Sequence, residues 1–180
     1  MTLKDLHIDK SWSLFLDRDG VINRKLENDY VKHWMEFEFL KGVLENFKKL
    51  NDVFGTVVVV TNQQGIGKGL YTREDLEIIH KNMLYELSYH KGIIHKVYYS
   101  PYLAAENHSM RKPNIGMALE AKKDFPDIDF QKSIIVGDSM SDMEFGRNAG
   151  MKTVFIHDES NEHPDIDFQF NSLSEFILAL

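Results

Sequence analysis

Two aspartates, Asp17 and Asp19, stand at the end of an apolar run and directly before Gly20. The apolar residues 14–16 predict a short strand that is buried on both faces of a parallel sheet. Side chains two residues apart in extended backbone leave on the same side, so the two carboxylates would lie close together and repel each other. Mg²⁺ relieves such repulsion, because it prefers oxygen ligands and keeps room for water and phosphate. The pair therefore predicts a carboxylate nucleophile beside a proton donor, with an ordinary solvated turn as the alternative.

A second run of apolar residues, the four valines at 57–60, also predicts a buried strand. It ends in Thr61 and Asn62, before a glycine-rich loop. A hydroxyl and backbone N–H groups at such a strand end can hydrogen-bond an anion. The loop sequence GIGKG at 65–69 does not match the spacing of the nucleotide-binding motifs, which argues against a nucleotide-binding loop.

Two adjacent cations, Arg111 and Lys112, precede Pro113 at the expected start of a helix over 114–125. Lysine offers phosphate a compact positive charge, and arginine offers a planar fork of donors. A Lys-Pro pair before a helix is also common on protein surfaces without any function. The pair indicates a phosphate-binding site only in combination with the other motifs.

Two further aspartates follow a buried strand expected over 133–136. Asp138 lies at the end of this strand, where it is well placed to bind a metal. Asp142 lies in the first turn of a helix expected over 141–149, where Ser141 and Glu144 form a capping-box pattern. Helix capping alone explains Asp142, but it does not explain Asp138.

In this order the four segments resemble the motifs of the haloacid dehalogenase superfamily of aspartate-nucleophile phosphatases. The segments are DRDGVIN, TNQQGIGKG, RKPNIGM and GDSMSD. They are most similar to the branch that contains heptose bisphosphate phosphatases and histidinol phosphatases. The resemblance extends over residues 13–157, so it also bears on the fold.

The resemblance implies a role for each motif residue. Asp17 would attack phosphorus and form an aspartyl-phosphate, while Asp19 would protonate the leaving oxygen and then activate water. Mg²⁺ would be bound by the Asp17 carboxylate, the Asp19 backbone carbonyl and Asp138, with Asp142 as a further ligand or a neighbour. The implied catalytic residues are Asp17, Asp19, Thr61 and Lys112; the substrate-binding residues are Asn62 and Arg111; and the metal-binding residues are Asp17, Asp19, Asp138 and Asp142.

The chain departs from the pattern of this branch in one respect. Many heptose bisphosphate phosphatases carry a zinc loop of three cysteines and a histidine, whereas this chain has no cysteine. At the corresponding places it has Ser100, Tyr102, His108 and Met110, of which His108 alone is a good zinc ligand. We therefore expect no zinc, and a loop over 100–110 that is held by the packing of tyrosines 98, 99 and 102.

The alternation of strands and helices predicts an α/β fold, a doubly wound three-layer sandwich with a mainly parallel central sheet. A length of 180 residues with 43% hydrophobic residues suits a single domain over 1–180. The superfamily's cap domains are insertions, and residues 23–40 and 69–99 are too short for one. Strands are expected near 14–16, 57–60, 93–99, 133–136, 153–156 and 167–170; helices are expected near 42–50, from Thr72, near 114–125 and 141–149, and from Ser172.

Composition narrows the range of partners. The formal net charge of −7 argues against nucleic acid as the main partner, and the chain has no apolar run long enough to span a membrane. We expect a cytoplasmic enzyme that acts on a small phosphorylated metabolite; the sequence leaves its oligomeric state open.

The expected substrate is D-glycero-D-manno-heptose 1,7-bisphosphate, with histidinol phosphate or another sugar phosphate as the alternative. A phosphoaspartate receiver module is an alternative of another class. A receiver would place its acceptor aspartate in mid-chain and its lysine after the last acidic motif, whereas here Lys112 precedes Asp138. A scaffold without catalysis would be expected to have lost a motif residue, and all of them are present.

Overall fold

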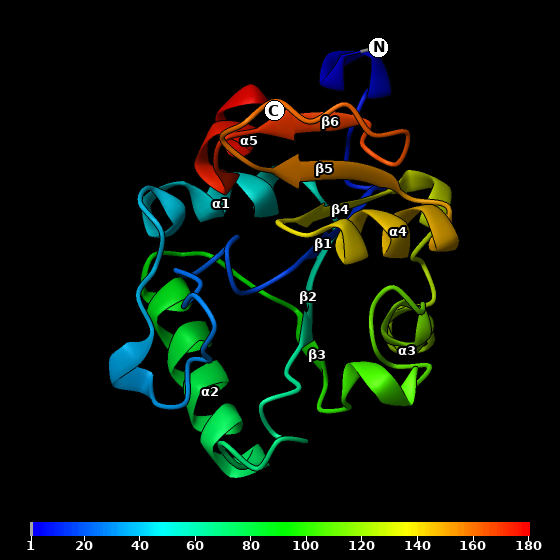
Figure 1. The fold of residues 1–180 in the computed structure, drawn as a ribbon. Coiled ribbons are helices and arrows are strands. Elements are labelled where there is room, and N and C mark those ends of the chain that lie inside the picture. Colours follow the sequence, from blue (N-terminus) through cyan, green and yellow to red (C-terminus); the bar gives the residue numbers. More distant parts are fainter. Residues whose placement is uncertain (1) are drawn as a thin grey trace.

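Six parallel strands form one sheet in the order β3-β2-β1-β4-β5-β6 in this computed structural model, which describes residues 2–180 (Figure 1). The strands are β1 Ser13–Leu16, β2 Thr56–Asn62, β3 Lys96–Ser100, β4 Ser133–Gly137, β5 Lys152–Ile156 and β6 Phe168–Phe170. The helices are α1 Val43–Val53, α2 Arg73–Tyr89, α3 Gly116–Asp124, α4 Met140–Ala149 and α5 Leu173–Ala179. No helix within residues 2–180 is both long and apolar enough to cross a membrane.

The sheet is the middle layer of three. Helices α1, α2 and α5 cover one face, and α3 and α4 cover the other (Figure 1). Leu14 and Leu16 of β1 pack into the core on the first face, whereas Phe15 packs into the core on the second. Both faces of the strand therefore need apolar side chains, which explains the unbroken apolar runs. The predicted doubly wound three-layer α/β fold is confirmed.

The expected elements are all present, with shifted ends. Strand β3 begins at Lys96, three residues later than expected, and α3 begins at Gly116 rather than at residue 114. Helix α2 begins as predicted, because the Thr72 side chain accepts a hydrogen bond from the backbone N–H of Asp75. Helix α4 begins at Met140, one residue earlier than expected, and its predicted capping pair was wrong, which bears on the site below.

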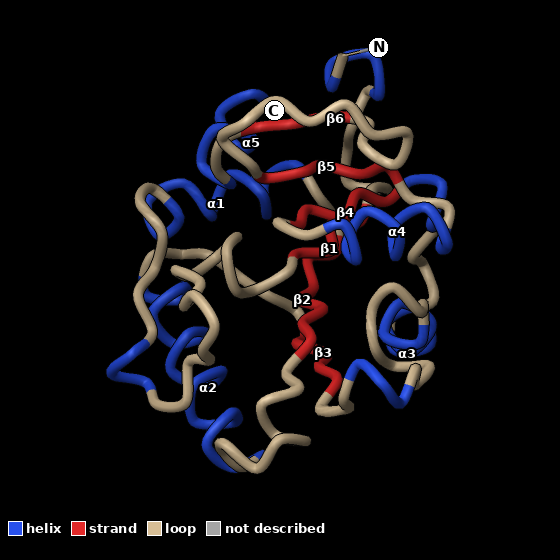
Figure 2. The backbone as a smooth tube through the Cα atoms, viewed as in Figure 1, coloured by secondary structure: helices blue, strands red, loops and turns tan. Residues whose placement is uncertain are grey.

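The connection from β1 to α1, residues 17–42, is mostly loop (Figure 2). Its short 3₁₀ turn η2, Trp34–Glu36, packs beside α2. The Trp34 ring stacks on Phe37 at 5.0 Å between centroids, and Phe39 meets Phe37 edge-on at the same separation. These aromatic side chains hold the loop against the core rather than lining a substrate site. Neither this connection nor the one from β2 to β3 contains a cap domain, because the structure describes only η2 and α2 within them.

The fold brings the four motifs to one edge of the sheet. Asp17 directly follows β1, Thr61 is the next-to-last residue of β2, and Asp138 directly follows β4. The three strands are adjacent, with β1 between the other two. Because they are parallel, their carboxyl ends meet at the same edge, where ligands of doubly wound folds bind.

Gly146 sets how closely α4 lies against the sheet, and α4 carries Asp142. A Cβ atom at this position would overlap methyl groups of Ile135 and Thr153. We expect Gly146→Ala to lower the free energy of unfolding by about 1–2 kcal/mol, because overpacking costs about 1–3 kcal/mol and the better helix propensity of alanine offsets at most about 1. Urea unfolding measures this, with Glu144→Ala on the exposed side of the same helix as the control. Equal stability of the two variants would contradict the close-packing account.

Candidate active site

A pocket of about 250 Å³ opens at the carboxyl ends of β1, β2 and β4. Seven of the eight predicted site residues line it, namely Asp17, Asp19, Thr61, Asn62, Arg111, Lys112 and Asp138. The eighth, Asp142, is fully buried behind the pocket and contacts Lys112. The structure thus brings together residues that are far apart in the sequence.

Lys112 is the buried centre of this arrangement. Its Nζ donates to Asp17 Oδ1 at 2.9 Å and to the Val60 carbonyl at 2.7 Å, and it lies 2.5 Å from Asp142 Oδ1. Asn62 holds the lysine backbone with two hydrogen bonds, because its Oδ1 accepts from Lys112 N–H at 3.0 Å and its Nδ2 donates to Lys112 O at 3.1 Å. A buried ammonium group with three oxygen partners is rigidly placed at the base of the pocket.

The Asp17 carboxyl has more negatively charged than positively charged neighbours. Burial raises the pKa of its carboxyl to about 7, and the neighbouring carboxylates of Asp142, Asp138 and Asp19 add to this effect while Lys112 opposes it. Burial also raises the pKa of Asp138, although Lys25 opposes the rise by donating to Asp138 Oδ2 at 2.7 Å. The site is therefore short of positive charge.

These carboxylates fit a divalent cation. Asp17, Asp138 and Asp142 each offer an oxygen atom, and the three atoms lie within 4.8 Å of one another. The Asp138 Oδ1 atom is buried and has no hydrogen-bond partner within residues 2–180. An unpartnered buried carboxylate oxygen beside others is the donor set that Mg²⁺ prefers.

Asp142 also caps α4, but not through the predicted pair. The capping residue is Ser139, whose N–H and hydroxyl donate to Asp142 Oδ2 at 3.1 and 2.6 Å. The predicted pair, Ser141 and Glu144, was wrong because the segment fits the capping pattern in two registers, and β4 ends early enough for the first. Asp142 thus uses one oxygen to cap the helix and turns the other toward Lys112.

Asp19 is held on both of its carboxylate oxygens. Oδ1 accepts from Arg18 Nη2 at 2.9 Å and from Asn23 Nδ2 at 3.0 Å, while Oδ2 accepts from Gln63 Nε2 at 2.9 Å. Burial alone would raise the pKa of Asp19, but the Arg18 guanidinium and these hydrogen bonds outweigh it and lower the pKa. Gln63 Nε2 also donates to Thr61 Oγ1 at 2.9 Å, which leaves the Thr61 hydroxyl proton free to donate into the pocket.

Comparison with known proteins agrees with this geometry. A family model described as "Polynucleotide kinase 3 phosphatase" matches residues 13–176. A D-glycero-alpha-D-manno-heptose-1,7-bisphosphate 7-phosphatase of Mycobacterium bovis is 38% identical over 173 residues, which cover 94% of this chain and 91% of that protein. The chain belongs to the haloacid dehalogenase superfamily of phosphatases.

Two other members of the superfamily extend the comparison. A D-glycero-beta-D-manno-heptose-1,7-bisphosphate 7-phosphatase of Helicobacter pylori is 33% identical over 170 residues, covering 92% of this chain and 94% of that protein. The crystal structure of D,D-heptose 1,7-bisphosphate phosphatase from B. bronchiseptica, in complex with magnesium and phosphate, has a TM-score of 0.83 and 26% identity. It covers 93% of this chain and 96% of that one.

The loop over 100–110, where many members of this superfamily branch hold zinc, is packed differently from the prediction. Tyr102 stacks on His108 with their ring centroids 3.4 Å apart, and its carbonyl accepts from Arg111 Nη1 at 3.2 Å. Tyr98 instead donates to Asp124, and Tyr99 lies near Arg73 of α2, so one of the three predicted tyrosines packs the loop. The absence of zinc stays a prediction.

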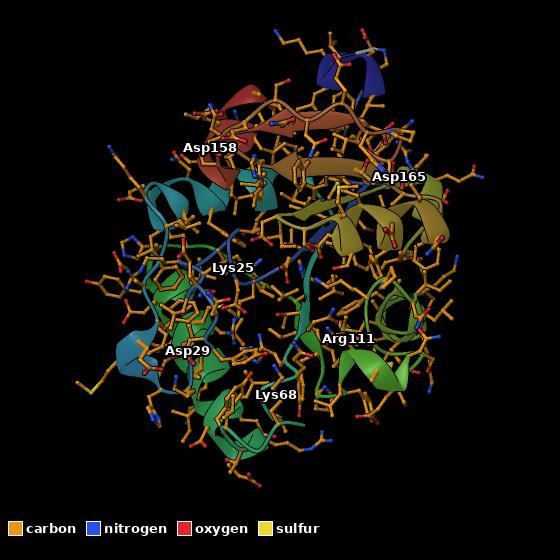
Figure 3. All side chains as sticks on the ribbon, in the orientation of Figure 1. Lys25, Asp29, Lys68, Arg111, Asp158 and Asp165 are labelled. Atoms are coloured by element: carbon orange, nitrogen blue, oxygen red, sulfur yellow. The ribbon has the colours of Figure 1, made fainter. Side chains whose placement is uncertain are left out.

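Two lysines at or near the pocket, Lys25 and Lys68, were not among the predicted site residues. Figure 3 shows Lys25, Lys68 and Arg111 on separate loops. Lys25 and Arg111 line the pocket, whereas Lys68 donates to the hydroxyl of Tyr30, which lines it. Lys25 lies in an irregular loop, where no periodic pattern indicates which way a side chain points.

The raised pKa of Asp17 leads to a prediction about metal binding. Below pH 7 the Asp17 carboxyl is mostly protonated and must lose its proton before it can bind Mg²⁺, so affinity falls as the pH falls. We expect the Kd for Mg²⁺ to be about tenfold weaker at pH 6 than at pH 8.

Isothermal titration calorimetry measures this, in buffers of different ionisation enthalpy so that proton release is counted. Asp138→Asn should bind Mg²⁺ far more weakly, whereas Asp124→Asn, at the C-terminal end of α3 and outside the pocket, should bind it normally. The same Kd at both pH values would show that Asp17 is not a ligand with a raised pKa.

Proposed function

We propose that this phosphatase hydrolyses D-glycero-D-manno-heptose 1,7-bisphosphate with Mg²⁺, through an aspartyl-phosphate on Asp17. The observation that carries the proposal is the placement of the Asp17 carboxylate at the base of the pocket, beside the Lys112 ammonium group and two further carboxylates. Phosphoryl transfer requires mainly positioning and charge neutralisation. The pocket supplies both, through fixed donors and a cation site.

The first half of the proposed reaction transfers the phosphoryl group to the protein. An Asp17 carboxylate oxygen attacks phosphorus, the bond from phosphorus to the sugar oxygen breaks, and that oxygen takes the proton of the Asp19 carboxylic acid. The Thr61 hydroxyl and the Lys112 ammonium hold the oxygens of the phosphoryl group. When bound, Mg²⁺ supplies positive charge that offsets the charge of the carboxylates and the phosphate.

The second half returns the protein to its starting state. The Asp19 carboxylate takes a proton from water, whose oxygen attacks phosphorus, and the bond from phosphorus to Asp17 breaks. This step needs Asp19 ionised, which is the state that Arg18 and Gln63 favour. The first step needs it protonated, and the negative charge of a phosphate arriving in the same pocket shifts Asp19 toward that form.

The choice of a sugar bisphosphate has two supports. Curated relatives that cover more than nine-tenths of this chain carry names of heptose 1,7-bisphosphate 7-phosphatases, of the alpha anomer at 38% identity and of the beta anomer at 33%. Lys25 and Arg111 both line the pocket from separate loops, so a second phosphate would meet positive charge there (Figure 3). The relatives favour the alpha anomer. We keep a cytoplasmic location as an expectation.

The test of this proposal is a comparison of kcat/KM, with Mg²⁺, across a panel of phosphate esters. The panel holds both anomers of the heptose bisphosphate, histidinol phosphate, simple sugar phosphates and a 3′-phosphorylated oligonucleotide, because the matching family model is named for polynucleotide phosphatases. We expect kcat/KM for the alpha anomer to exceed that for every other ester by at least about tenfold, a difference of about 1.4 kcal/mol. A higher kcat/KM for the oligonucleotide or for histidinol phosphate would overturn the assignment of the substrate.

The proposed nucleophile leads to a second prediction. Asp17→Asn keeps the shape of the side chain, and Lys112 keeps its partner Asp142, so the fold should survive. Turnover should fall by at least about three orders of magnitude, because an amide cannot form the phosphoryl bond. Phosphate release measures the loss and circular dichroism checks the fold, with Asp52→Asn on the exposed face of α1 as the control. Near-normal turnover by purified Asp17→Asn would exclude Asp17 as the nucleophile.

A further inference from the structure

Arg18 supports the Asp19 carboxylate with a charge that does not line the pocket. It lies between the two motif aspartates, and its side chain is fully buried. One nitrogen, Nη2, donates to both oxygens of Asp19 at 2.9 and 3.0 Å. The other, Nη1, donates to His80 Nε2 at 3.1 Å, and the guanidinium carbon lies 5.9 Å from the centre of the Phe37 ring. A buried guanidinium with so few partners depends strongly on each of them.

His80 is fitted to accept this hydrogen bond. It is a buried residue of α2, 62 positions along the chain from Arg18. Burial, reinforced by the Arg18 charge, lowers the pKa of His80 to about 3, so the ring is neutral and Nε2 carries a lone pair. The histidine therefore anchors the guanidinium to a helix that contributes no motif residue.

A second set of contacts holds the other side of Asp19. Gln63 Nε2 donates to Asp19 Oδ2, and Gln63 Oε1 accepts from the buried hydroxyl of Tyr71. Because Tyr71 donates, the amide oxygen of Gln63 must face the tyrosine and its NH₂ group must face Asp19. The tyrosine thereby fixes which way the amide is turned.

We propose that His80 and Tyr71 are positioning residues, which act through Arg18 and Gln63 to hold the Asp19 carboxyl where it exchanges its proton with the leaving oxygen and with water. Neither residue lines the pocket. Both lie on or beside α2, so this helix serves the reaction without contacting the substrate. The inference rests on the proposed function, since it assigns to Asp19 the two proton transfers described there.

The experiment separates proton transfer from binding by changing the leaving group. A sugar oxygen needs the Asp19 proton to leave, whereas 4-nitrophenolate leaves without one. With 4-nitrophenyl phosphate, the first turnover gives a burst of 4-nitrophenolate. The rate of later turnovers is limited by the attack of water on the aspartyl-phosphate, which needs Asp19 as the base. Rapid-mixing kinetics with the heptose bisphosphate and with 4-nitrophenyl phosphate, in Mg²⁺, measure both steps.

For His80→Leu we expect the first turnover of the heptose bisphosphate to slow by about 10- to 100-fold. The burst rate with 4-nitrophenyl phosphate should stay within about twofold of wild type, although its steady-state rate should fall. KM should change little, because no contact with the substrate is lost. His80→Gln, whose amide oxygen can accept from Arg18, should recover most of the rate, and His90→Leu at the exposed end of α2 should behave as wild type.

Tyr71→Phe removes one hydroxyl and keeps the ring, so it provides the test if His80→Leu does not fold. It should show the same pattern, because the Gln63 amide becomes free to turn its oxygen toward Asp19. Equal slowing of the first turnover with both substrates, or no slowing in either variant, would overturn the proposal. A wild-type enzyme with no burst and no aspartyl-phosphate would instead refute the proposed function itself, and that result is recognisable before any variant is made.

Discussion

The buried ammonium group of Lys112 is the charge around which the site is built. Its partners come from three adjacent regions of the fold: Asp17 after β1, the Val60 carbonyl in β2, and Asp142 in α4. Asn62 anchors its backbone from the end of β2. An unpartnered ammonium group could not stay charged at this depth, so the lysine and the two carboxylates depend on one another.

This pairing leaves the pocket with an excess of negative charge. Lys112 is shared between two carboxylates, and Lys25 reaches Asp138 from an exposed loop. Burial and mutual repulsion raise the pKa values of Asp17 and Asp138 accordingly. A metal ion would relieve this excess, and the metal together with the lysine would then attract a phosphate. The carboxylates whose ionisation is disfavoured in the free protein are thus the ones that we propose bind Mg²⁺.

Much of the site could be predicted from the sequence, for a definite reason. Asp17, Thr61 and Asp138 each follow or end an apolar run, and parallel strands bring such ends to one edge of the sheet. Local pattern thus determines their position. The predicted capping pair of α4 was wrong because the segment satisfies the capping pattern in two registers, and the end of β4 decides between them.

The contacts around Asp19 could not be predicted. The hydrogen bond from Arg18 to His80 joins residues 62 positions apart, and a lone histidine on a helix gives no sign of its partner. The same holds for Lys25, whose contact with Asp138 spans 113 positions. Such contacts depend on how loops and helix faces meet after folding. Asp17, Thr61 and Asp138 follow the strand pattern, whereas Arg18, His80 and Lys25 do not.

The most direct test of the account is to identify the phosphorylated residue. The enzyme is mixed with substrate and Mg²⁺, quenched in acid during turnover, and reduced with borohydride, which converts an aspartyl-phosphate to homoserine. Peptide mass spectrometry should find homoserine at position 17 and unchanged aspartate at positions 19, 138 and 142. Homoserine at any of those three positions, or phosphate release with no reducible intermediate, would contradict the account.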